Sequence, residues 1–273
     1  MADILRKAGN ALDSAIAVFS PQTAVKRREW RDAFYGYEAA SPTRKDLPFP
    51  ADGRAEGFNK ISRGTLRARA RHLDRNSDVI HGIISAFENN VIGVGLNMQA
   101  DTKYDAFNKR IEALWSEWKH HENCDATNAQ SIDEMERMAI HRWLVDGGLM
   151  FNYVFDPKAL FPLKIQVREV DEIDDGSNPQ IDGENILSDG VEINKFGAPV
   201  AYWLSQTDAN GYEMAPVRIP AANIDFLWIK SRPSEYREIS PLGRSITRVQ
   251  DIEDYANAVA FQQKMNACTS VLS

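Results

Sequence analysis

A change in the spacing of apolar residues at Gly147-Gly148 constrains the fold of this chain more than any other feature. Before this pair, apolar residues recur with the 3.6-residue period of amphipathic helices. After it, the period is close to two as far as Ile229, and a helical pattern returns after Ser240. This order predicts an α+β protein with a helical body, a β-rich insert and a long C-terminal helix.

Three helical segments are predicted before the change of period. The first covers residues 62–91 and ends at Gly93, because glycine readily adopts the conformation that ends helices. A short strand-like run follows over residues 94–98. The second helix is expected over residues 104–120, and the third begins at a capping box, Ser131-x-x-Glu134, and ends at Asp146. The second helix is expected to bury its apolar side chains, which are Phe107, Ile111, Leu114, Trp115 and Trp118.

The insert is predicted to contain strands separated by Asp-Gly, Asn-Lys-Phe-Gly and Asn-Gly turns, which are common hairpin connections. The expected strands cover residues 149–155, 163–170, 190–193, 198–204, 217–219 and 224–229. Ser240 as cap and Pro241 at the first helical position then predict a final helix of about 30 residues, or about 45 Å. A helix that long and alanine-rich needs partners, either other subunits or further chain.

The N-terminal part has a different pattern. Residues 2–20 predict a weak amphipathic helix that ends before Pro21, and residues 41–60 are rich in Pro, Gly and charge, which predicts an extended arm. We therefore divide the chain into four stretches. They are 1–60 (N-terminal helix and extended arm), 61–148 (helical region), 149–235 (β-rich insert) and 236–273 (long helix).

Charge is unevenly distributed along the chain. The net charge is −7, but residues 1–75 carry fifteen Lys and Arg against nine Asp and Glu. A basic first quarter on an acidic body predicts an arm that binds phosphates or a partner's carboxylates. The acidic body argues against tight wrapping of nucleic acid, because each neutralised phosphate needs a cation. One interpretation of this charge pattern is a module that binds nucleic acid through residues 1–75.

Cysteine content and hydropathy restrict the class of protein. Cys124 and Cys268 cannot build a disulfide framework and match no zinc-binding spacing, which favours a reducing compartment. The apolar runs are shorter than the ~20 residues of a membrane helix, and Asp3, Arg6 and Lys7 interrupt any secretory signal. We therefore expect a soluble protein made inside the cell, with no membrane partner.

Motifs for catalysis are weak. The chain lacks the Gly-Lys-Ser/Thr of a phosphate-binding loop, and the segment Gly243–Thr247 lacks the last glycine of a nucleophile elbow. His120, His121 and Cys124 lie close together, but a polar helix end is a better interpretation than a zinc site, which usually needs a fourth ligand. We predict no catalytic residue, no cofactor and no metal site.

An acidic run is the best candidate for metal-assisted chemistry. Clustered carboxylates can hold Mg²⁺ or Ca²⁺, and two-metal nucleases use such clusters. A solvated turn, or a surface on which a partner docks, explains the same pattern. The run consists of Glu169, Asp171, Glu172, Asp174 and Asp175.

An arginine stripe is more specific. Arg63, Arg67, Arg71 and Arg75 are spaced by four and lie on one side of a helix, where like charges repel by a few tenths of a kcal/mol per pair. We therefore expect acidic groups against the stripe, either carboxylates of a neighbouring subunit or phosphates. A plain solvated face is the alternative.

Several short segments are informative because of the order in which they occur along the chain. Tyr37-Glu38-Ala39-Ala40 precedes Leu66-Arg-Ala-Arg-Ala-Arg71-His-Leu-Asp-Arg75-Asn76, and Asn90-Val-Ile-Gly93-Val-Gly95 follows. The hairpin segment 190–202 and then Ser240-Pro-Leu come later. Together they resemble the portal proteins of tailed bacteriophages, lambda family, from about residue 10 to 270.

The resemblance implies a helical wing, a β-rich clip and a non-enzymatic subunit of a ring, usually of twelve copies, at one vertex of the capsid. Such a ring nucleates head assembly, docks terminase, passes double-stranded DNA and later binds head-completion proteins. It acts in the virion, after assembly with capsid proteins in the host cytoplasm. Family members continue past the position of Ser273, which predicts a truncated, prophage-derived or fragmentary chain. The alternative function is a metal-dependent phage DNA-processing nuclease centred on residues 169–175.

Overall fold

The computed structural model describes residues 12–34, 52–176, 179–181, 183–208, 210 and 212–270. Two compact units are present, Met1–Asp52 and Gly53–Ser273. In the first unit, residues 12–19 are helical, as predicted, and a second helix, α2 (Pro21–Phe34), was not predicted. The central part of the predicted arm lies outside the described residues. The arm prediction is wrong for residues 55–60, because α3 already begins at Ala55.

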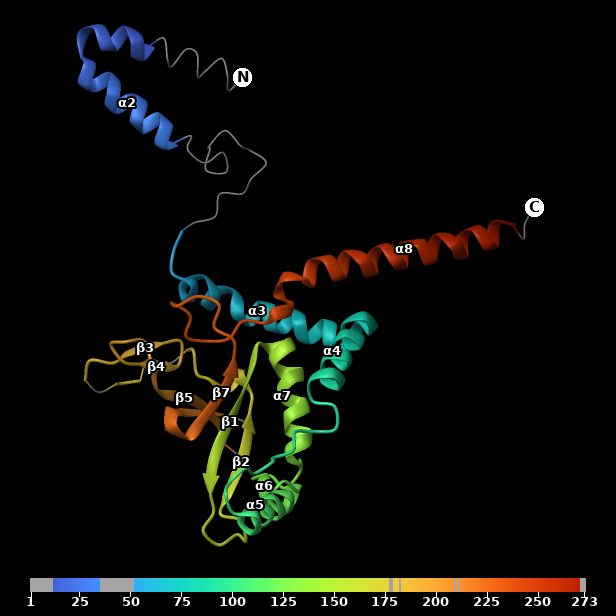
Figure 1. The fold of residues 1–273 in the computed structure, drawn as a ribbon. Helices are drawn as coiled ribbons and strands as arrows, with labels where there is room; N and C mark the ends of the chain where they lie inside the picture. Colours follow the sequence, from blue (N-terminus) through green and yellow to red (C-terminus); the bar gives the residue numbers. More distant parts are fainter. Residues whose placement is uncertain are drawn as a thin grey trace. The chain divides into compact units, whose positions relative to one another are not determined.

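The helical layer of the second unit consists of α3 (Ala55–Asn76), α4 (Asp78–Val91) and α7 (Ile132–Asp146) (Figure 1). The single helix predicted over residues 62–91 is divided at Ser77. Its hydroxyl oxygen accepts a hydrogen bond of 3.3 Å from the backbone N–H of Ile80, which caps the new helix. The predicted capping box at Ser131 is confirmed, and Gly147 ends α7 with a φ of 97°.

The segment between α4 and α7 differs from the prediction in its secondary structure and in its burial. Residues 94–98 form no strand, and Gly93 and Gly95 adopt positive φ angles of 59° and 98°. Helix α5 (Asp105–Trp118) occurs as predicted, followed by α6 (His121–Cys124). The prediction that α5 is buried is wrong for Phe107 and Leu114, which are 53% and 46% exposed.

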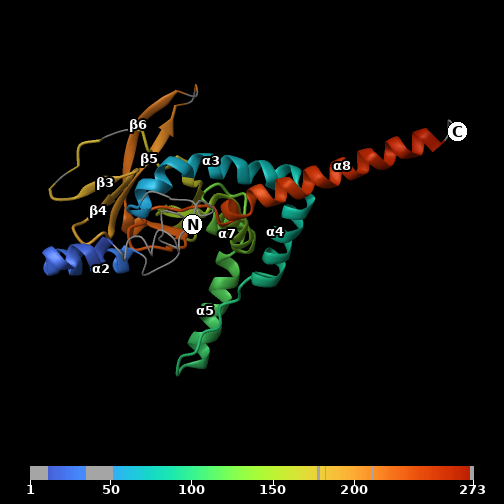
Figure 2. The ribbon, with the colours of Figure 1, turned by 90° about the horizontal axis from the view of Figure 1, so that it is seen from above.

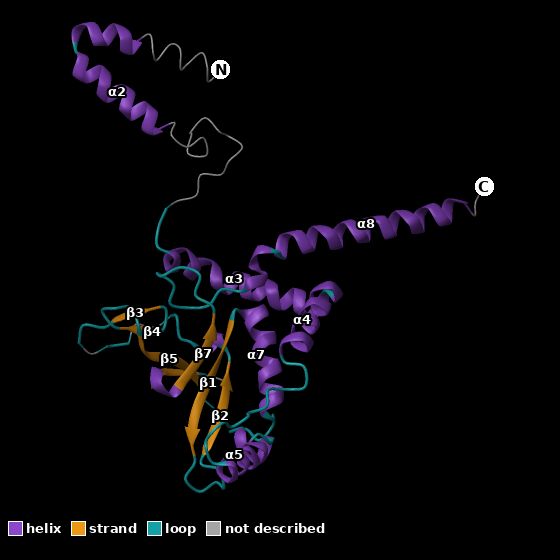
Figure 3. Ribbon diagram, in the orientation of Figure 1, coloured by secondary structure: helices purple, strands orange, loops and turns teal. Residues whose placement is uncertain are grey.

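Two antiparallel sheets form the β-rich part, which confirms the α+β class (Figure 3). The first has the order β2-β1-β7, with strands at Gly148–Phe155 (β1), Leu163–Arg168 (β2) and Ile224–Trp228 (β7). The second has the order β3-β4-β5-β6, with strands at Ile186–Ser188 (β3), Val191–Ile193 (β4), Pro199–Thr207 (β5) and Glu213–Pro220 (β6). Strand β3 was not predicted, and the end of the second predicted strand is instead a 3₁₀ turn, η2 (Val170–Glu172).

The predicted Asp-Gly turn is present between β3 and β4. Asp189 and Gly190 have φ angles of 53° and 78°, the backbone of a two-residue hairpin loop whose twist matches that of the strands. The turn brings the carboxylate of Asp189 into the interior, where the side chain is 1% exposed. A short connection thus positions a buried charge.

Apolar side chains form three buried clusters. The first joins α3, α4 and α7 to the start of the C-terminal helix, and includes Leu73, Ile80, Ile84, Val145 and Ile246. The second lies between the two sheets and includes Met150, Val191, Tyr202 and Leu204. The third lies where α5, α6 and α7 meet the first sheet, and includes Cys124, Ile132 and Met135.

The C-terminal helix extends away from these clusters. A short 3₁₀ turn, η3 (Ala221–Asn223), precedes β7. A further 3₁₀ turn, η4 (Pro241–Arg244), leads into α8 (Ile246–Ser270). Helix α8 has 25 residues, or ~37 Å, somewhat less than predicted. Ile246 and Val249 pack on the helical cluster, whereas the rest of the helix projects from the body of this unit (Figures 1 and 2).

Candidate functional site

The two charged features of the sequence meet each other in the structure. Arg71 of α3 donates hydrogen bonds of 2.9 and 3.1 Å to Asp171 and of 3.3 Å to Glu169, both in the acidic run. Its Nε and Nη2 also donate to Asp146 on α7, at 2.7 and 3.2 Å. Arg71 therefore joins α3, α7 and the segment after β2 through paired, charge-assisted hydrogen bonds.

The ionisation of the two acidic partners reflects this contact. Burial disfavours the charged form of Asp171, but the hydrogen bonds and positive charge of Arg71 outweigh it and lower the pKa of this carboxyl group. Burial and the nearby negative charge of Asp171 raise the pKa of Glu169. Glu169 and Asp171 of the acidic run thus share one arginine of the same chain as their cation.

A second, fully buried ionic cluster surrounds Arg63. This side chain donates to Glu56 and Asp189, and to the backbone carbonyl of Glu238 at 3.0 Å. Arg237 lies beside it and donates to the carbonyl oxygens of Asp189 and Val170, at 3.1 and 2.9 Å, and to the carboxylate of Glu238. The cluster connects α3 to the β3–β4 turn and to the chain before α8, because each buried charge requires a partner.

The other two arginines of the stripe differ. Arg67 lies 3.4 Å from the carboxylate of Glu238 and is largely buried, whereas Arg75 is exposed and forms no ion pair with any residue that the structure describes. Carboxylates of the same chain therefore face Arg63, Arg67 and Arg71. Contacts of the stripe with another subunit or with phosphate stay a prediction, for which Arg75 is the accessible member.

Several residues of these two ionic clusters had little signal in the sequence. Asp146, Asp189, Arg237 and Glu238 were not singled out, since they are far from α3 along the chain and belong to no motif. Arg63 and Asp189, for example, are separated by 126 positions. A dense charge pattern, Glu235-Tyr-Arg237-Glu238, was the one available indication.

The rest of the acidic run lies near the surface. Glu172 pairs with Arg168 at 2.5 Å, and Asp174 accepts a hydrogen bond of 3.2 Å from the backbone N–H of Gly176. Asp175 is exposed. Within the described ranges, no three His, Cys, Asp or Glu side chains are grouped so that they could hold a metal ion. The geometry offers the nuclease alternative no support.

In the histidine–cysteine segment, Cys124 is part of a buried apolar cluster. Cys124 is buried, and its thiol lies 3.4 Å from the carbonyl oxygen of Lys119. Burial and the negative charge of Asp125 raise the pKa of this thiol to about 11. A buried, protonated thiol of this kind is typical of a structural cysteine. His120 and His121 are exposed.

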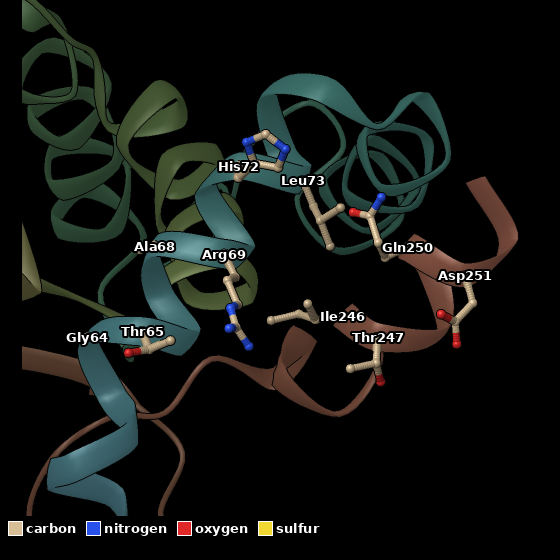
Figure 4. Close-up of a pocket in the computed structure, with 10 residues that line it drawn as sticks. All are labelled: Gly64, Thr65, Ala68, Arg69, His72, Leu73, Ile246, Thr247, Gln250 and Asp251. Atoms are coloured by element: carbon tan, nitrogen blue, oxygen red, sulfur yellow. The ribbon is translucent and has the colours of Figure 1, made fainter. Parts of the chain in front are cut away.

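A groove lies between α3 and the start of α8 (Figure 4). Its volume is about 690 Å³, with Ala68, Leu73 and Ile246 among its walls and Arg69 and Asp251 at opposite sides. The lining residues are Gly64, Thr65, Ala68, Arg69, His72, Leu73, Ile246, Thr247, Gln250 and Asp251.

A smaller groove of about 420 Å³, lined by apolar side chains that include Trp115 and Trp118, lies beside α5. In the part of the chain described here, no helix combines the length and apolarity needed to cross a bilayer.

Comparison with known proteins identifies the family. The family model described as phage portal protein, lambda family, matches residues 48–272, which includes nearly the whole of the second unit. This chain belongs to the lambda family of phage portal proteins. The resemblance read from the ordered segments is thereby confirmed, although Tyr37–Ala40 precedes the matched range and lies outside the described residues.

A curated relative agrees with the family model. The portal chain is 27% identical over 206 residues to a protein of Halomonas phage phiHAP-1 named "Probable portal protein". The matched region covers 71% of this chain and 40% of that relative. The match therefore covers less than half of the relative, and the activities of a whole portal are proposals for this chain.

Proposed function

We propose that this chain is a non-enzymatic subunit of a ring at one vertex of the phage capsid. The ring has twelve copies, passes double-stranded DNA, and docks terminase, head-completion and capsid proteins. It assembles in the host cytoplasm and remains in the virion. The observation that carries the proposal is the family match, because it extends over all of the helical layer, both sheets and all of α8.

The charge distribution is compatible with a conduit. The chain has a net charge of −7 despite its basic first quarter, so the body is acidic. An acidic wall binds a DNA duplex weakly, because few counterions are released on contact. Weak binding favours movement of the duplex past the subunit.

Residues of the two charged features have proposed roles in assembly. Arg75, at the exposed end of the stripe formed with Arg63, Arg67 and Arg71, would contact a neighbouring subunit or phosphate. The acidic run would dock a partner through Asp175, its exposed member. Reversing the charge at Arg75 tests the first role with little effect on folding, since Arg75 has no ion-pair partner among the described residues.

The oligomeric state of the purified 273-residue chain tests the proposed function. We expect light scattering to give a mass of about twelve subunits, and negative-stain electron microscopy to reveal rings with a central hole. A chain that stays monomeric at micromolar concentration would contradict the proposal for this chain. Incubation with DNA and Mg²⁺ should leave the DNA intact, whereas cleavage abolished by Asp171→Ala would revive the nuclease alternative.

A further inference from the structure

The outward face of α3 is exposed and has no partner element among the residues that the structure describes. Arg63, Arg67 and Arg71 occupy the face directed to the interior, where they bind carboxylates. The opposite face consists mainly of small residues around Ile61, which is 82% exposed. This face includes Gly57, Ile61, Gly64, Thr65, Ala68 and His72, and its central part forms one wall of the groove with α8.

No contact among the described residues explains why position 64 on this wall is a glycine. A Cβ atom at Gly64 would meet nothing within 4 Å, and its φ is not positive. Glycine inside a helix lowers stability relative to alanine, so its presence is costly unless another backbone must approach closely. The wall runs from Gly64 to His72, about 12 Å or two helical turns. This length suits a second helix laid along it.

The portal chain itself carries an apolar helix of the required kind. Beyond its first turns, α8 is exposed, with Ile252 at 63%, Tyr255 at 72% and Val259 at 37%. These three residues recur at intervals of three and four, so they share one face. A helix with so much apolar surface is normally covered by a partner.

Charge is complementary between the α3 wall of the groove and the first half of α8. Among the described residues, Arg69 at the groove and Arg75 at the end of α3 form no ion pair. The first half of α8 carries Asp251 and Asp254, which are exposed and likewise form no ion pair in the described part. Opposite charges around an apolar contact steer association and fix its register.

From these observations we infer that the groove between α3 and α8 receives the α8 helix of a second copy of this chain. The face of Ile252, Tyr255 and Val259 packs on Gly64 and Ala68, with the acidic residues of α8 towards Arg69. Groove and helix are different surfaces, so the contact is head-to-tail and repeats from copy to copy, as a closed ring requires. The inference rests on the proposed function and names the contact that builds the ring.

Intermolecular disulfide formation tests the contact. Each chain carries Cys268→Ser, and a tagged chain with Ala68→Cys is mixed with untagged chains carrying Ile252→Cys, Tyr255→Cys or Val259→Cys. Under mild oxidation, at least one pair should give tenfold more mixed disulfide than a control pair in which Ser116→Cys on α5 replaces the α8 cysteine. Because the two cysteines are on different molecules, only an intermolecular contact can link them.

Two matched glycine variants provide a second measurement. Gly64→Leu fills the groove and should weaken self-association at least tenfold by light scattering. Gly82→Leu on α4 should not change it, although Gly82 also faces open space. Both substitutions introduce a better helix former, so neither is expected to unfold the chain.

The outcomes separate the inference from the proposed function. Rings without the predicted disulfides, and unaffected by Gly64→Leu, would overturn the inference and leave the portal ring intact. Disulfide-linked open multimers without rings would support the α3–α8 contact and contradict the closed ring. A monomeric chain with no disulfides above the control would overturn both.

Discussion

Arg71 binds Asp146 through two hydrogen bonds, of 2.7 and 3.2 Å, and so ties the arginine-rich helix α3 to α7. Asp146 is the last residue of α7, directly before Gly147, and its side chain is 2% exposed. The pair therefore holds the helical layer at the point where the chain enters the first sheet.

We predict that Asp146→Asn lowers the free energy of unfolding by about 2 kcal/mol, because the buried side chain loses its charge and one of the two oxygens that accept hydrogen bonds from Arg71. Urea unfolding followed by circular dichroism measures the change. Asp175→Asn, at an exposed position, serves as control and should change stability by less than ~0.5 kcal/mol. Equal stabilities for the two variants would argue against a structural role of the Arg71–Asp146 pair.

The buried cluster around Arg237 predicts a larger effect. Arg237→Met removes a cation that is 2% exposed and leaves Glu238 with fewer partners in the interior. Removing one member of a buried ion pair typically costs about 3–5 kcal/mol, which we expect here in urea unfolding. Arg244→Met, an exposed arginine of η4, is the matched control and should be nearly neutral. A neutral Arg237→Met would mean that the cluster does not stabilise the fold.

Stability should decrease in acid, partly through Asp125. Burial disfavours ionisation of this carboxyl group, but hydrogen bonds from Thr127, Ala129 and Gln130 outweigh it and lower its pKa. A carboxyl group whose pKa is lower in the folded state contributes its full stabilisation above its unfolded pKa of about 3.9. The contribution is lost as the pH falls from there through the folded pKa.

Unfolding free energies measured between pH 6 and pH 3 test this prediction. Asp125→Asn should be less stable than the parent at pH 6, and the difference should shrink towards pH 3. A difference that stays constant over this range would show that ionisation of Asp125 does not contribute.

Two glycine substitutions should have opposite effects. Gly147 has a φ of 97°, and an added Cβ would lie 2.6 Å from the carbonyl carbon of Ile239. Gly147→Ala should therefore cost more than the ~1–2 kcal/mol of the left-handed backbone alone. Gly82→Ala, inside α4 with nothing within 4 Å, should add about 0.5–1 kcal/mol to stability. Thermal unfolding of both variants measures the signs, and the same sign for both would contradict this account.

The larger helices and most strands were predictable because their signals are local. The Ser131 capping box and the Gly147 stop mark the ends of α7, and the Asp189-Gly190 turn marks a hairpin. Predictions were less accurate where the decisive contact is remote. The run at residues 94–98 alternates like a strand, but the backbone N–H of Leu96 donates to Glu136, 40 positions away, and no sheet partner is present in the described residues.

The sequence alone determined the α+β class, the change from helix to sheet at Gly147, and the resemblance to the portal family, because periodicity, turn chemistry and ordered motifs are properties of neighbouring residues. Only the tertiary structure decided what faces the arginine stripe. Arg71 and Asp171 are 100 positions apart, and their pairing depends on how α3 packs against the segment after β2. Arg71 of the stripe and Glu169 and Asp171 of the acidic run therefore pair within one chain, although both patterns suggested external partners. Ion pairing depends on distance in space and leaves no period along the sequence.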